Sequence, residues 1–296
     1  MVFSFPKISI VVATYGNKGV LERALKGMLQ VNYPNEFEII VVDDGSRDGT
    51  PQMMEKVFGK EKKIKFIGLG KNQGVCRARN RGIAEAKFPI VVNMDHDCIP
   101  EKRWLKELIK PFENKRVGVV SSFGDFGGTS TAFRKKLIEK VGGYDERYRY
   151  YREDTDLTFG VMDLGYEYVH LPEPMYIHDH EEVTPKGTVA LLKYFWKRLN
   201  YHQNDALLFK KHRKLATKFL DVKAGFLVNP KNDFSVVTGT WMEPYELVLS
   251  SPRGMRFVEN ETPLHAVLII SAGIIYTIAI KLFRLIGSIR FGTLLL

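Results

Sequence analysis

Two aspartates separated by one residue follow a short apolar run in the first half of the chain. Residues 90–92 are isoleucine and valine, which is typical of a buried strand, and Asp95, His96 and Asp97 come shortly after them. Two carboxylates so close together repel each other unless a cation shares them, and Mg²⁺ or Mn²⁺ suits such oxygen ligands. The pair therefore predicts a site for a divalent cation. The alternative is a solvated acidic turn after a strand.

The elements that must position these aspartates alternate between strand and helix. Strands followed by turn residues are predicted within residues 7–19, 37–50, 62–70 and 88–100, and the stretches of helical spacing that come after them are 20–29, 50–58, 75–86 and 104–112. This repeated alternation indicates an α/β fold, a mostly parallel sheet with helices on both faces. Because ligands bind beyond the carboxyl ends of parallel strands, the acids at these strand ends are expected to meet at one site.

The alternation weakens after residue 112. A further strand is predicted over residues 117–123, a glycine-rich loop over 124–131, a helix over 132–141 and a strand over 167–171. A second acidic cluster lies within residues 152–164, between the last two of these elements.

Composition describes an ordinary globular protein with an excess of positive charge. Hydrophobic residues make up 45% of the chain and charged residues 26%, so a disordered chain is not expected. The net charge of +10 suits DNA, acidic lipid or phosphorylated substrates. Cys76 and Cys98 are the two cysteines, which fits a reducing compartment and excludes a disulfide scaffold or a cysteine-based zinc pattern.

The C-terminal third changes character. Residues 186–218 are rich in Lys, Arg and aromatic residues and predict a pair of basic helices with Tyr194, Phe195 and Trp196 on their apolar side. Such helices fit an anionic membrane surface, and a solvated helix pair with long cationic side chains is the alternative.

An apolar stretch near the C-terminus predicts association with a membrane. Residues 264–280 contain no Asp, Glu, Lys or Arg. A span needs about 20 apolar residues, and this stretch reaches that length only by including Lys281 and Arg284. A spanning helix, a re-entrant helix and an in-plane helix all stay open, as does a buried or oligomer-forming helix.

Six segments in a fixed order resemble the motifs of inverting family-2 glycosyltransferases with the GT-A fold. They are ISIVVATYGN, VVDDGSRDGT, KNQGVCRARNRGI, VVNMDHD, TAFRKKLIEKVGGYDE and EDTDL, and the resemblance covers roughly residues 7–180. Ala13, where many members have proline, and the additional Gly16 depart from the family pattern. The resemblance implies a nucleotide-diphosphate sugar donor, such as a UDP- or GDP-sugar, a divalent cation (Mn²⁺ or Mg²⁺), and an acceptor hydroxyl on a glycan or a polyprenyl-phosphate-linked sugar.

The resemblance assigns residues to the donor nucleotide. By position in the motifs, Thr14 and Tyr15 would line the nucleoside pocket. Asp44, with Asp43 beside it, would accept a hydrogen bond from the ring N–H of the base. Arg79 would lie near the nucleotide.

The resemblance also assigns the metal and the base. Asp95 and Asp97 would form the family's D-x-D motif, which holds the cation that bridges the two donor phosphates. Asp154, directly after a glutamate, would be the general base that takes the proton of the acceptor hydroxyl; capping of a helix N-terminus is its ordinary alternative. His178 would complete the metal shell as it does in some relatives, and a packed or surface histidine is equally open.

Two segments are expected to face the acceptor. They are the loop at residues 124–131 and residues 144–152, in which arginines and tyrosines could bind a sugar or a lipid phosphate. A solvated basic loop is an equally good interpretation of the second segment.

These observations predict three regions. Residues 1–182 would form a GT-A catalytic domain, with a donor half over about 1–100 and an acceptor half over about 101–182. Residues 183–262 would form a basic, aromatic helical extension, and residues 263–296 an apolar, membrane-associated segment. The protein would then work at the cytoplasmic face of the cell membrane, where nucleotide sugars are found.

Two other functions were weighed against glycosyl transfer. A sugar nucleotidyltransferase has a glycine-rich loop with a basic residue directly after the first strand, whereas ATYGNKG offers only Lys18 and no G-x-G run. A basic nucleic-acid-binding module would explain the charge but gives no reason for acids to gather at strand ends. No nucleic-acid partner is therefore expected.

Overall fold

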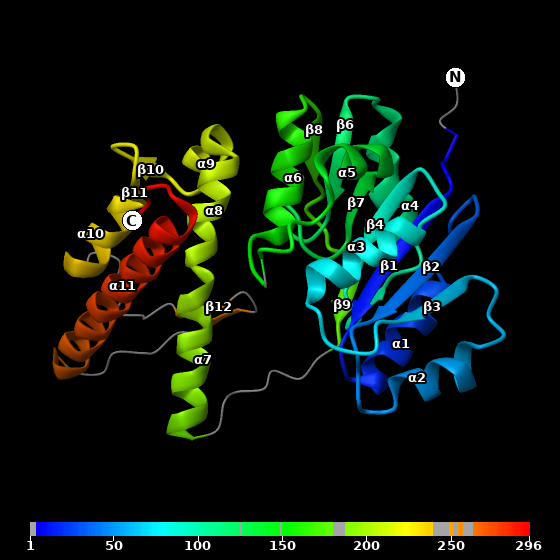
Figure 1. The fold of residues 1–296 in the computed structure, drawn as a ribbon, viewed down its shortest axis with the longest axis horizontal. Coiled ribbons are helices and arrows are strands. Elements are labelled where there is room, and N and C mark those ends of the chain that lie inside the picture. The colour runs from blue at the N-terminus through cyan, green and yellow to red at the C-terminus, as the bar shows by residue number, and fades with distance from the viewer. Residues whose placement is uncertain are drawn as a thin grey trace. The chain divides into compact units, whose positions relative to one another are not determined.

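The computed structural model describes residues 4–124, 126–148, 150–179, 187–238, 249–251, 254–256 and 263–296. The chain divides into two compact units, Met1–Thr184 and Pro185–Leu296, and each is described by itself. The first unit contains a sheet with helices against it, and the second is built mainly of helices (Figure 1).

A seven-stranded sheet forms the centre of the first unit (Figure 1). Its strands lie in the order β3-β2-β1-β4-β7-β6-β8. Their bounds are β1 (Ile8–Thr14), β2 (Phe37–Asp43), β3 (Ile64–Gly68), β4 (Ile90–Asn93), β6 (Val117–Ser121), β7 (Thr131–Arg134) and β8 (Glu167–His170). Within this sheet β7 pairs antiparallel with β4 and β6, and the other neighbours are parallel. The predicted α/β fold with a mostly parallel sheet is confirmed.

Helices cover both faces of this sheet because its strands are apolar on both sides. Ile8, Ile10 and Val12 of β1 belong to one buried cluster with residues of α1 and α4, whereas Val11 faces α3 on the other side. The helices of this unit are α1 (Lys18–Leu29), α2 (Thr50–Met53), the π-helix η1 (Met54–Phe58), α3 (Val75–Glu85), α4 (Trp104–Ile109), the 3₁₀-helix η2 (Lys110–Glu113), α5 (Lys135–Val141) and α6 (Glu153–Asp163).

Close packing of α3 on the sheet depends on Gly82. A Cβ at this position would lie 2.5 Å from Cγ1 of Val11 and 3.3 Å from Cγ2 of Val42, so a larger residue would force the helix away from β1 and β2. Arg79, three residues earlier on the same helix, is thereby held against the interior, where 6% of its surface is exposed.

The helix predicted over residues 132–141 is wrong in its first part. Thr131–Arg134 forms strand β7, and only Lys135–Val141 is helical. Thr131, Ala132 and Phe133 are almost completely buried between β4 and β6. Pairing on both sides decides the conformation here, because this tetrapeptide has no strong preference of its own.

A small second sheet lies beside the end of β4. β5 (Cys98–Pro100) pairs antiparallel with β9 (Tyr176–His178), and Cys98 lies opposite His178 in the register. This pairing brings the residues directly after the D-x-D aspartates next to residues that follow the last of the six motifs.

The second unit is helical. The basic stretch forms three helices, α7 (Thr188–Tyr201), α8 (Gln203–Lys211) and α9 (Arg213–Phe219), so the predicted pair is wrong. His212, with φ −123° and ψ 53°, leaves the helical region and separates the last two. The other elements are β10 (Val222–Lys223), β11 (Leu227–Val228), α10 (Pro230–Thr238), β12 (Leu249–Ser251), β13 (Gly254–Arg256) and α11 (Pro263–Phe291).

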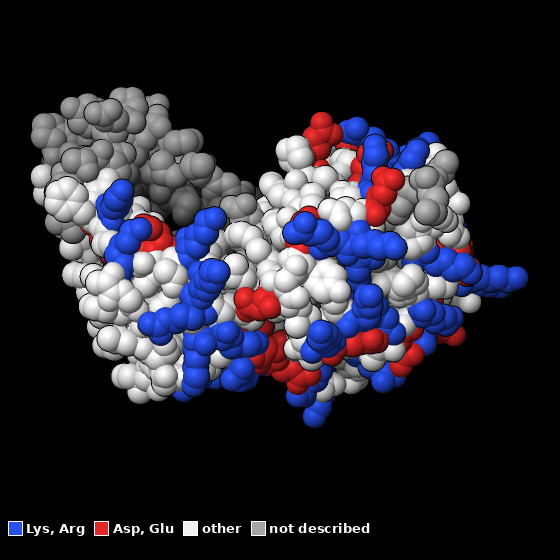
Figure 2. Space-filling view, turned by 90° about the horizontal axis from the view of Figure 1, so that it is seen from above, with Lys and Arg blue, Asp and Glu red and all other residues white. Residues whose placement is uncertain are grey.

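Helix α11 carries the predicted apolar stretch. Its segment Ile270–Phe291 is long and apolar enough to cross a membrane, judged by length and composition alone. Two of its cations are paired inside the unit: Arg284 Nε lies 3.0 Å from Oδ2 of Asp205, and Lys281 Nζ lies 2.6 Å from Oδ2 of Asp233. Lys and Arg are spread over much of the face of the molecule in Figure 2.

Candidate active site

The loops after β1 and β2 are joined at the edge of the sheet. Thr14, the last residue of β1, is the register partner of Asp43 and is 3% exposed, whereas Tyr15 is 55% exposed. Asp43 accepts hydrogen bonds from the backbone N–H and the hydroxyl of Ser46, and Ser46 Oγ accepts one from Gly16 N at 2.7 Å. The predicted nucleoside residues therefore lie together on one preformed rim.

Asp44 joins this rim to α3. Its Oδ1 accepts a hydrogen bond from Gln73 N at 2.7 Å and its Oδ2 one from Gly74 N at 2.9 Å. The carboxylate is 4% exposed. Each carboxylate oxygen has a second lone pair, so these backbone bonds do not exhaust its capacity as an acceptor.

Arg79 connects the acids of the two halves of the unit. Its Nη2 donates to Oδ1 of Asp95 at 3.1 Å, and its Nη1 donates to Oδ1 and Oδ2 of Asp154 at 3.1 and 3.3 Å. The same Nη1 lies 3.5 Å from Oε1 of Glu153. One guanidinium thus faces three carboxylates, of which Asp95 follows β4 and the other two begin α6.

This crowding shifts protonation. Burial lowers the pKa of Arg79, but Asp154, Tyr144, Asp95 and Glu153 outweigh it and hold that pKa well above its ordinary value. Desolvation raises the pKa of Asp95 against the opposing effect of Arg79. Desolvation, with repulsion from Asp154, raises the pKa of Glu153 to about 7. Asp95 still has 40% of its side chain exposed, so a ligand can reach it.

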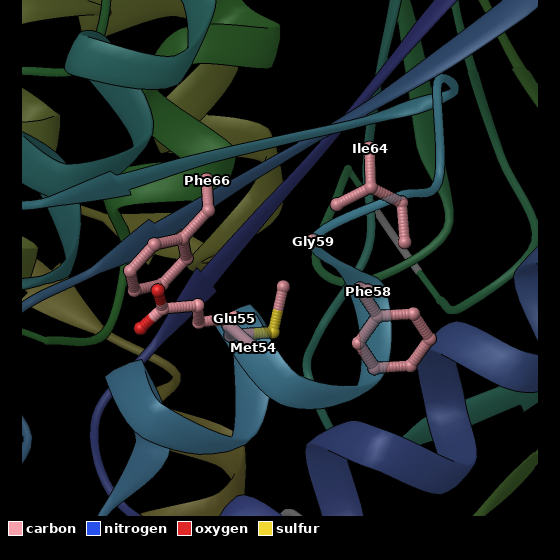
Figure 3. Close-up of a pocket in the computed structure, with 6 residues that line it drawn as sticks. All are labelled: Met54, Glu55, Phe58, Gly59, Ile64 and Phe66. Carbon is pink, nitrogen blue, oxygen red and sulfur yellow. The ribbon is translucent and has the colours of Figure 1, made fainter.

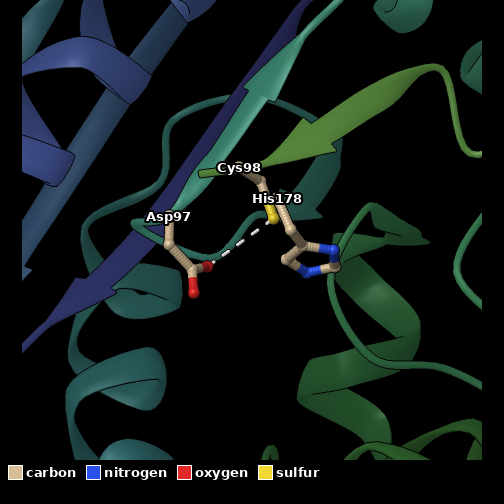
Figure 4. A group of neighbouring side chains, drawn as sticks. All are labelled: Asp97, Cys98 and His178. Carbon is tan, nitrogen blue, oxygen red and sulfur yellow. Dashed lines mark hydrogen bonds between the residues drawn. The ribbon is translucent and has the colours of Figure 1, made fainter. Parts of the chain in front are cut away.

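A second group of possible ligand atoms lies on the β5–β9 pair. One atom each of Asp97, Cys98 and His178 lies within 4.8 Å of the others, and the Cys98 thiol and Asp97 carboxylate are 3.7 Å apart (Figure 4). A carboxylate oxygen and an imidazole nitrogen at this spacing fit Mn²⁺. Burial raises the pKa of the Cys98 thiol, so Cys98 is protonated and a poorer ligand than its neighbours.

The predicted metal ligands are thus only partly brought together. Asp97 and His178 share one group, whereas Asp95 faces Arg79 and is not part of that group. His180 lies outside the described residues. Sequence reasoning did not consider Cys98 as a neighbour of the metal, although its place directly after Asp97 was visible.

Asp154 lies in the first turn of α6 and is bound from two sides. Besides Arg79, the hydroxyl of Tyr144 donates to its Oδ1 at 2.9 Å, and Asn93 Nδ2 donates to that hydroxyl. Sequence reasoning missed Asn93. Its signal was a polar residue at the end of a buried apolar strand, where it is 1% exposed.

The segment at residues 144–152 differs from its prediction. Tyr144 and Tyr148 are buried, at 2% and 1% exposure, and use their hydroxyls on Asp154 and Asp156 instead of facing an acceptor. Arg147 pairs with Asp145. Tyr150 is 49% exposed, and Arg149 lies outside the described residues.

A separate cavity of about 190 Å³ lies between η1 and β3 (Figure 3). Apolar side chains dominate its lining, which is Met54, Glu55, Phe58, Gly59, Ile64 and Phe66. It is smaller than the roughly 300–1,000 Å³ of typical ligand sites and contains none of the predicted residues.

Comparison with known proteins decides the family. The family model described as Glycosyl transferase family 2 matches residues 9–165, more than half of the chain. The chain belongs to glycosyl transferase family 2. The matched range includes Thr14, Arg79, the D-x-D aspartates and Asp154, and ends before His178.

Curated relatives of this family-2 chain match part of it. It is 29% identical over 210 residues to the probable glycosyltransferase YdaM of Bacillus subtilis, covering 56% of this chain and 49% of that protein. It is 27% identical over 135 residues to the glycosyltransferase AglE of Haloferax volcanii, covering 44% of each. The poly-beta-1,6-N-acetyl-D-glucosamine synthase of Staphylococcus epidermidis is 32% identical over 115 residues, 38% of this chain and 27% of the synthase. The chain spans about half the length, or less, of these relatives.

A solved structure shares the fold. The mannosyltransferase PcManGT of Pyrobaculum calidifontis, solved in complex with GDP-Man and Mn²⁺, superposes with a TM-score of 0.65 and 18% identity over 97% of this chain and 87% of its own. This family-2 chain therefore has the predicted GT-A fold.

Proposed function

We propose that this family-2 protein is a metal-dependent, inverting glycosyltransferase. The observation that carries the proposal is the meeting of Arg79 with Asp95 and Asp154. Through this shared guanidinium Asp154, the proposed base, lies next to Asp95, the first aspartate of the D-x-D motif. An acid pair at the ends of parallel strands, next to a rim suited to a nucleoside, fits a nucleotide-diphosphate sugar as the donor.

The proposed reaction is a single displacement. The acceptor hydroxyl oxygen bonds to the anomeric carbon while the bond from that carbon to the diphosphate oxygen breaks, and the acceptor proton passes to Asp154. Because attack comes from the side opposite the diphosphate, the anomeric configuration inverts. Asp97 and His178 would hold the divalent cation, and Asp95 would join them or stay with Arg79. When bound, the cation supplies positive charge that stabilises the departing diphosphate.

The arrangement of the rim residues supports the proposal that they bind the donor nucleoside. Thr14 and Asp43 end adjacent strands, and exposed Tyr15 follows them. Asp44, whose carboxylate is held by two backbone N–H groups, would accept a hydrogen bond from the ring N–H of a uracil or guanine base. GDP-sugars and UDP-sugars both satisfy this requirement, so both belong in a test.

The second unit supports a membrane-associated protein with a lipid-linked acceptor. Lys and Arg residues line α7 to α9, and large apolar residues on α7 and α11 are exposed, among them Leu192, Trp196, Ile275 and Ile289. Basic charge beside apolar surface suits an anionic membrane. The acceptor would then be a polyprenyl-phosphate-linked glycan at the cytoplasmic face of the cell membrane.

Donor binding tests the proposal. Purified full chain in detergent is mixed with a panel of UDP- and GDP-sugars, with and without Mn²⁺, and the thermal unfolding midpoint is measured. We expect one donor to raise the midpoint only with Mn²⁺, and Asp97→Asn to abolish that rise. Glu139→Gln, which changes an exposed carboxylate of the same unit, should keep it.

The outcome that contradicts metal dependence is equal stabilisation by a donor without Mn²⁺ or in Asp97→Asn. Stabilisation by no donor at all would contradict donor binding. For a donor that binds, transfer to polyprenyl-phosphate-linked and free sugars is compared, and the anomeric configuration of the product is read by NMR. A product that retains the donor configuration would contradict the inverting reaction.

A further inference from the structure

Tyr144 is fixed more firmly than its position in a turn requires. Its backbone N–H donates to Oδ1 of Asn80 and its carbonyl oxygen accepts from Nδ2 of the same residue, both at 2.8 Å. The guanidinium of Arg79 lies over its ring, 5.3 Å from the centroid. Gly143, at φ +77°, allows this approach, because a Cβ there would lie 2.7 Å from Oδ1 of Asn80. Asn80 therefore holds the backbone of Tyr144, and Arg79 packs against the face of its ring.

The hydroxyl of Tyr144 has a defined direction. Asn93 Nδ2 donates to the hydroxyl oxygen, so the hydroxyl proton is left to point at Oδ1 of Asp154, 2.9 Å away. Burial raises the pKa of Tyr144 well above its ordinary value, which keeps the phenol protonated and able to donate.

The two oxygens of Asp154 are consequently unequal. Oδ1 accepts from Tyr144 at 2.9 Å and from Arg79 at 3.1 Å, whereas the bond from Arg79 to Oδ2 is longer, 3.3 Å. An oxygen that already accepts two hydrogen bonds has little capacity for a further proton donor. Oδ2 is the oxygen better placed to receive one.

We propose that Tyr144 is a positioning residue that, together with Asn93, holds Oδ1 of Asp154 and presents Oδ2 to the acceptor hydroxyl. This inference rests on the proposed function of Asp154 as base. In the reaction the acceptor O–H bond breaks, its oxygen bonds to the anomeric carbon, and the proton goes to Oδ2. Tyr144 keeps its own proton throughout and touches neither substrate.

Other charged groups face Asp154, but none of them fixes one oxygen in this way. Arg79 reaches both oxygens, and Glu153 and Asp95 are carboxylates that face the same guanidinium. The Cys76 thiol donates a hydrogen bond to the backbone carbonyl oxygen of Tyr148, and burial raises the pKa of this thiol, so Cys76 stays neutral. The distinction between Oδ1 and Oδ2 therefore comes mainly from Tyr144.

Removal of one hydroxyl tests the proposal, and the chain offers a matched control. Tyr148, four residues later, is equally buried and its hydroxyl donates to Oδ1 of Asp156 at 3.0 Å on the same helix. Tyr144→Phe and Tyr148→Phe thus remove similar hydrogen bonds at different carboxylates. Both variants are assayed as full chains, with active sites counted by donor-binding stoichiometry.

We expect kcat per active site to fall roughly tenfold in Tyr144→Phe, the loss that corresponds to a barrier about 1.4 kcal/mol higher, with KM of donor and acceptor unchanged. Tyr148→Phe should lose similar thermal stability and keep the wild-type kcat per site. Equal loss of kcat in both variants would show a structural effect only. Unchanged kcat in Tyr144→Phe would overturn the proposal.

A second variant covers the case in which Tyr144→Phe does not fold. Asn93→Leu removes the donor that orients the Tyr144 hydroxyl, together with a buried carbonyl oxygen that has no hydrogen-bond partner among the described residues. It should lower kcat per site by about threefold at unchanged KM, a smaller loss because the hydroxyl remains. An unchanged kcat per site in this variant would also overturn the proposal.

Asp154→Asn separates this inference from the function beneath it. If the wild type transfers sugar and Asp154→Asn loses activity while Tyr144→Phe does not, only the positioning role is wrong. If Asp154→Asn transfers as well as the wild type, Asp154 is not the base and the proposed function itself fails at this residue.

Discussion

The two units of the chain differ in where they place their buried charges and their apolar surface. In the first, apolar strands and helices fill the interior and carboxylates gather at the strand ends around Arg79. In the second, Asp205 is completely buried beside Arg284, while isoleucines such as Ile275 and Ile289 are 69% and 77% exposed on α11. The first unit follows the usual pattern of a protein in water, with its buried charged groups concentrated around its site. The second buries the Asp205–Arg284 pair but exposes large apolar side chains of α7 and α11 beside its surface Lys and Arg residues, and an exposed apolar face of this kind marks a surface for contact with a partner or a membrane.

The buried charged groups have a different role in each unit. The buried charges of the first unit leave the two oxygens of Asp154 unequally bonded and hold Asp95 against Arg79, with 40% of the Asp95 side chain still exposed to a ligand. Those of the second unit form closed pairs inside a helical bundle. Pairing of this kind removes cations from a surface that is otherwise apolar, and it allows α11 to keep one apolar face although Lys281 and Arg284 lie within its length.

The largest expected effect comes from breaking the buried pair of the second unit. Asp205→Leu leaves Arg284 buried without its carboxylate and should cost about 3–5 kcal/mol of unfolding free energy. Native-state hydrogen exchange of the α8 and α11 amides measures this loss of stability in the second unit itself. Glu36→Gln, at an ion pair with Lys7 whose side chains are 58% and 50% exposed, should cost less than about 1 kcal/mol.

The double variant Asp205→Leu/Arg284→Met sharpens this test. Because it removes both charges, we expect it to recover most of the loss. A double variant as unstable as Asp205→Leu would mean that packing, and not the unpaired cation, sets the cost.

A smaller effect is expected from Glu153 in the first unit. Its pKa of about 7 lies above the ordinary value of 4.5, so the folded state favours the protonated form. The stability that this contributes is present below pH 4.5 and is lost as the pH rises through 7. Glu153→Gln, always neutral, should therefore gain about 3 kcal/mol over the wild type at pH 8, the free energy that corresponds to this rise of the pKa, and nothing below pH 4.5.

Urea unfolding at several pH values measures the difference, with Glu139→Gln as the exposed control. A Gln variant that is less stable than the wild type at pH 8 would show that Glu153 is charged there and that its contact with Arg79 stabilises the fold.

The smallest effect on stability is expected on the exposed face of α11. Replacing Ile275 and Ile289 by serine should change the unfolding free energy by less than about 0.5 kcal/mol per site, because both side chains are mostly exposed. Binding to anionic vesicles should nevertheless fall roughly tenfold for the pair, since apolar area no longer enters the interface. Val57→Ser, at a 41% exposed site of the first unit, should leave vesicle binding unchanged. Unchanged binding of the α11 variant would contradict the proposed membrane face.

The strands nearest the N-terminus could be predicted because each carries its own signal. Ile8–Thr14, Phe37–Asp43 and Ile90–Asn93 are apolar runs that end in polar residues and turns. Strand β7 lacks such a signal: its four residues are strand because two neighbours pair with them, and that information lies elsewhere in the chain.

The candidate site shows the same division. The types and order of Asp95, Asp97 and Asp154 could be read from the motifs, and whether they act as assigned stays a prediction. Their partners could not be read, because Arg79 and Asp154 are 75 residues apart in the chain. Nor does a tyrosine in a turn reveal whether its hydroxyl faces solvent or a buried carboxylate. The sequence therefore predicts that residues 144–152 face the acceptor or form a solvated loop, whereas the structure buries Tyr144 and Tyr148.

The pairing of β5 with β9 also has a consequence for the order of events during synthesis. β1 to β5 leave the ribosome well before β9, and N-terminal segments generally begin to fold first. Asp97 is then in place before the chain has delivered His178, which reaches it through the β5–β9 register and the 2.7 Å bond from Asp179 N to Asp97 O. A nascent chain that ends before β9 has the D-x-D carboxylates without the imidazole, so the proposed ligand pair of Asp97 and His178 exists only late in folding.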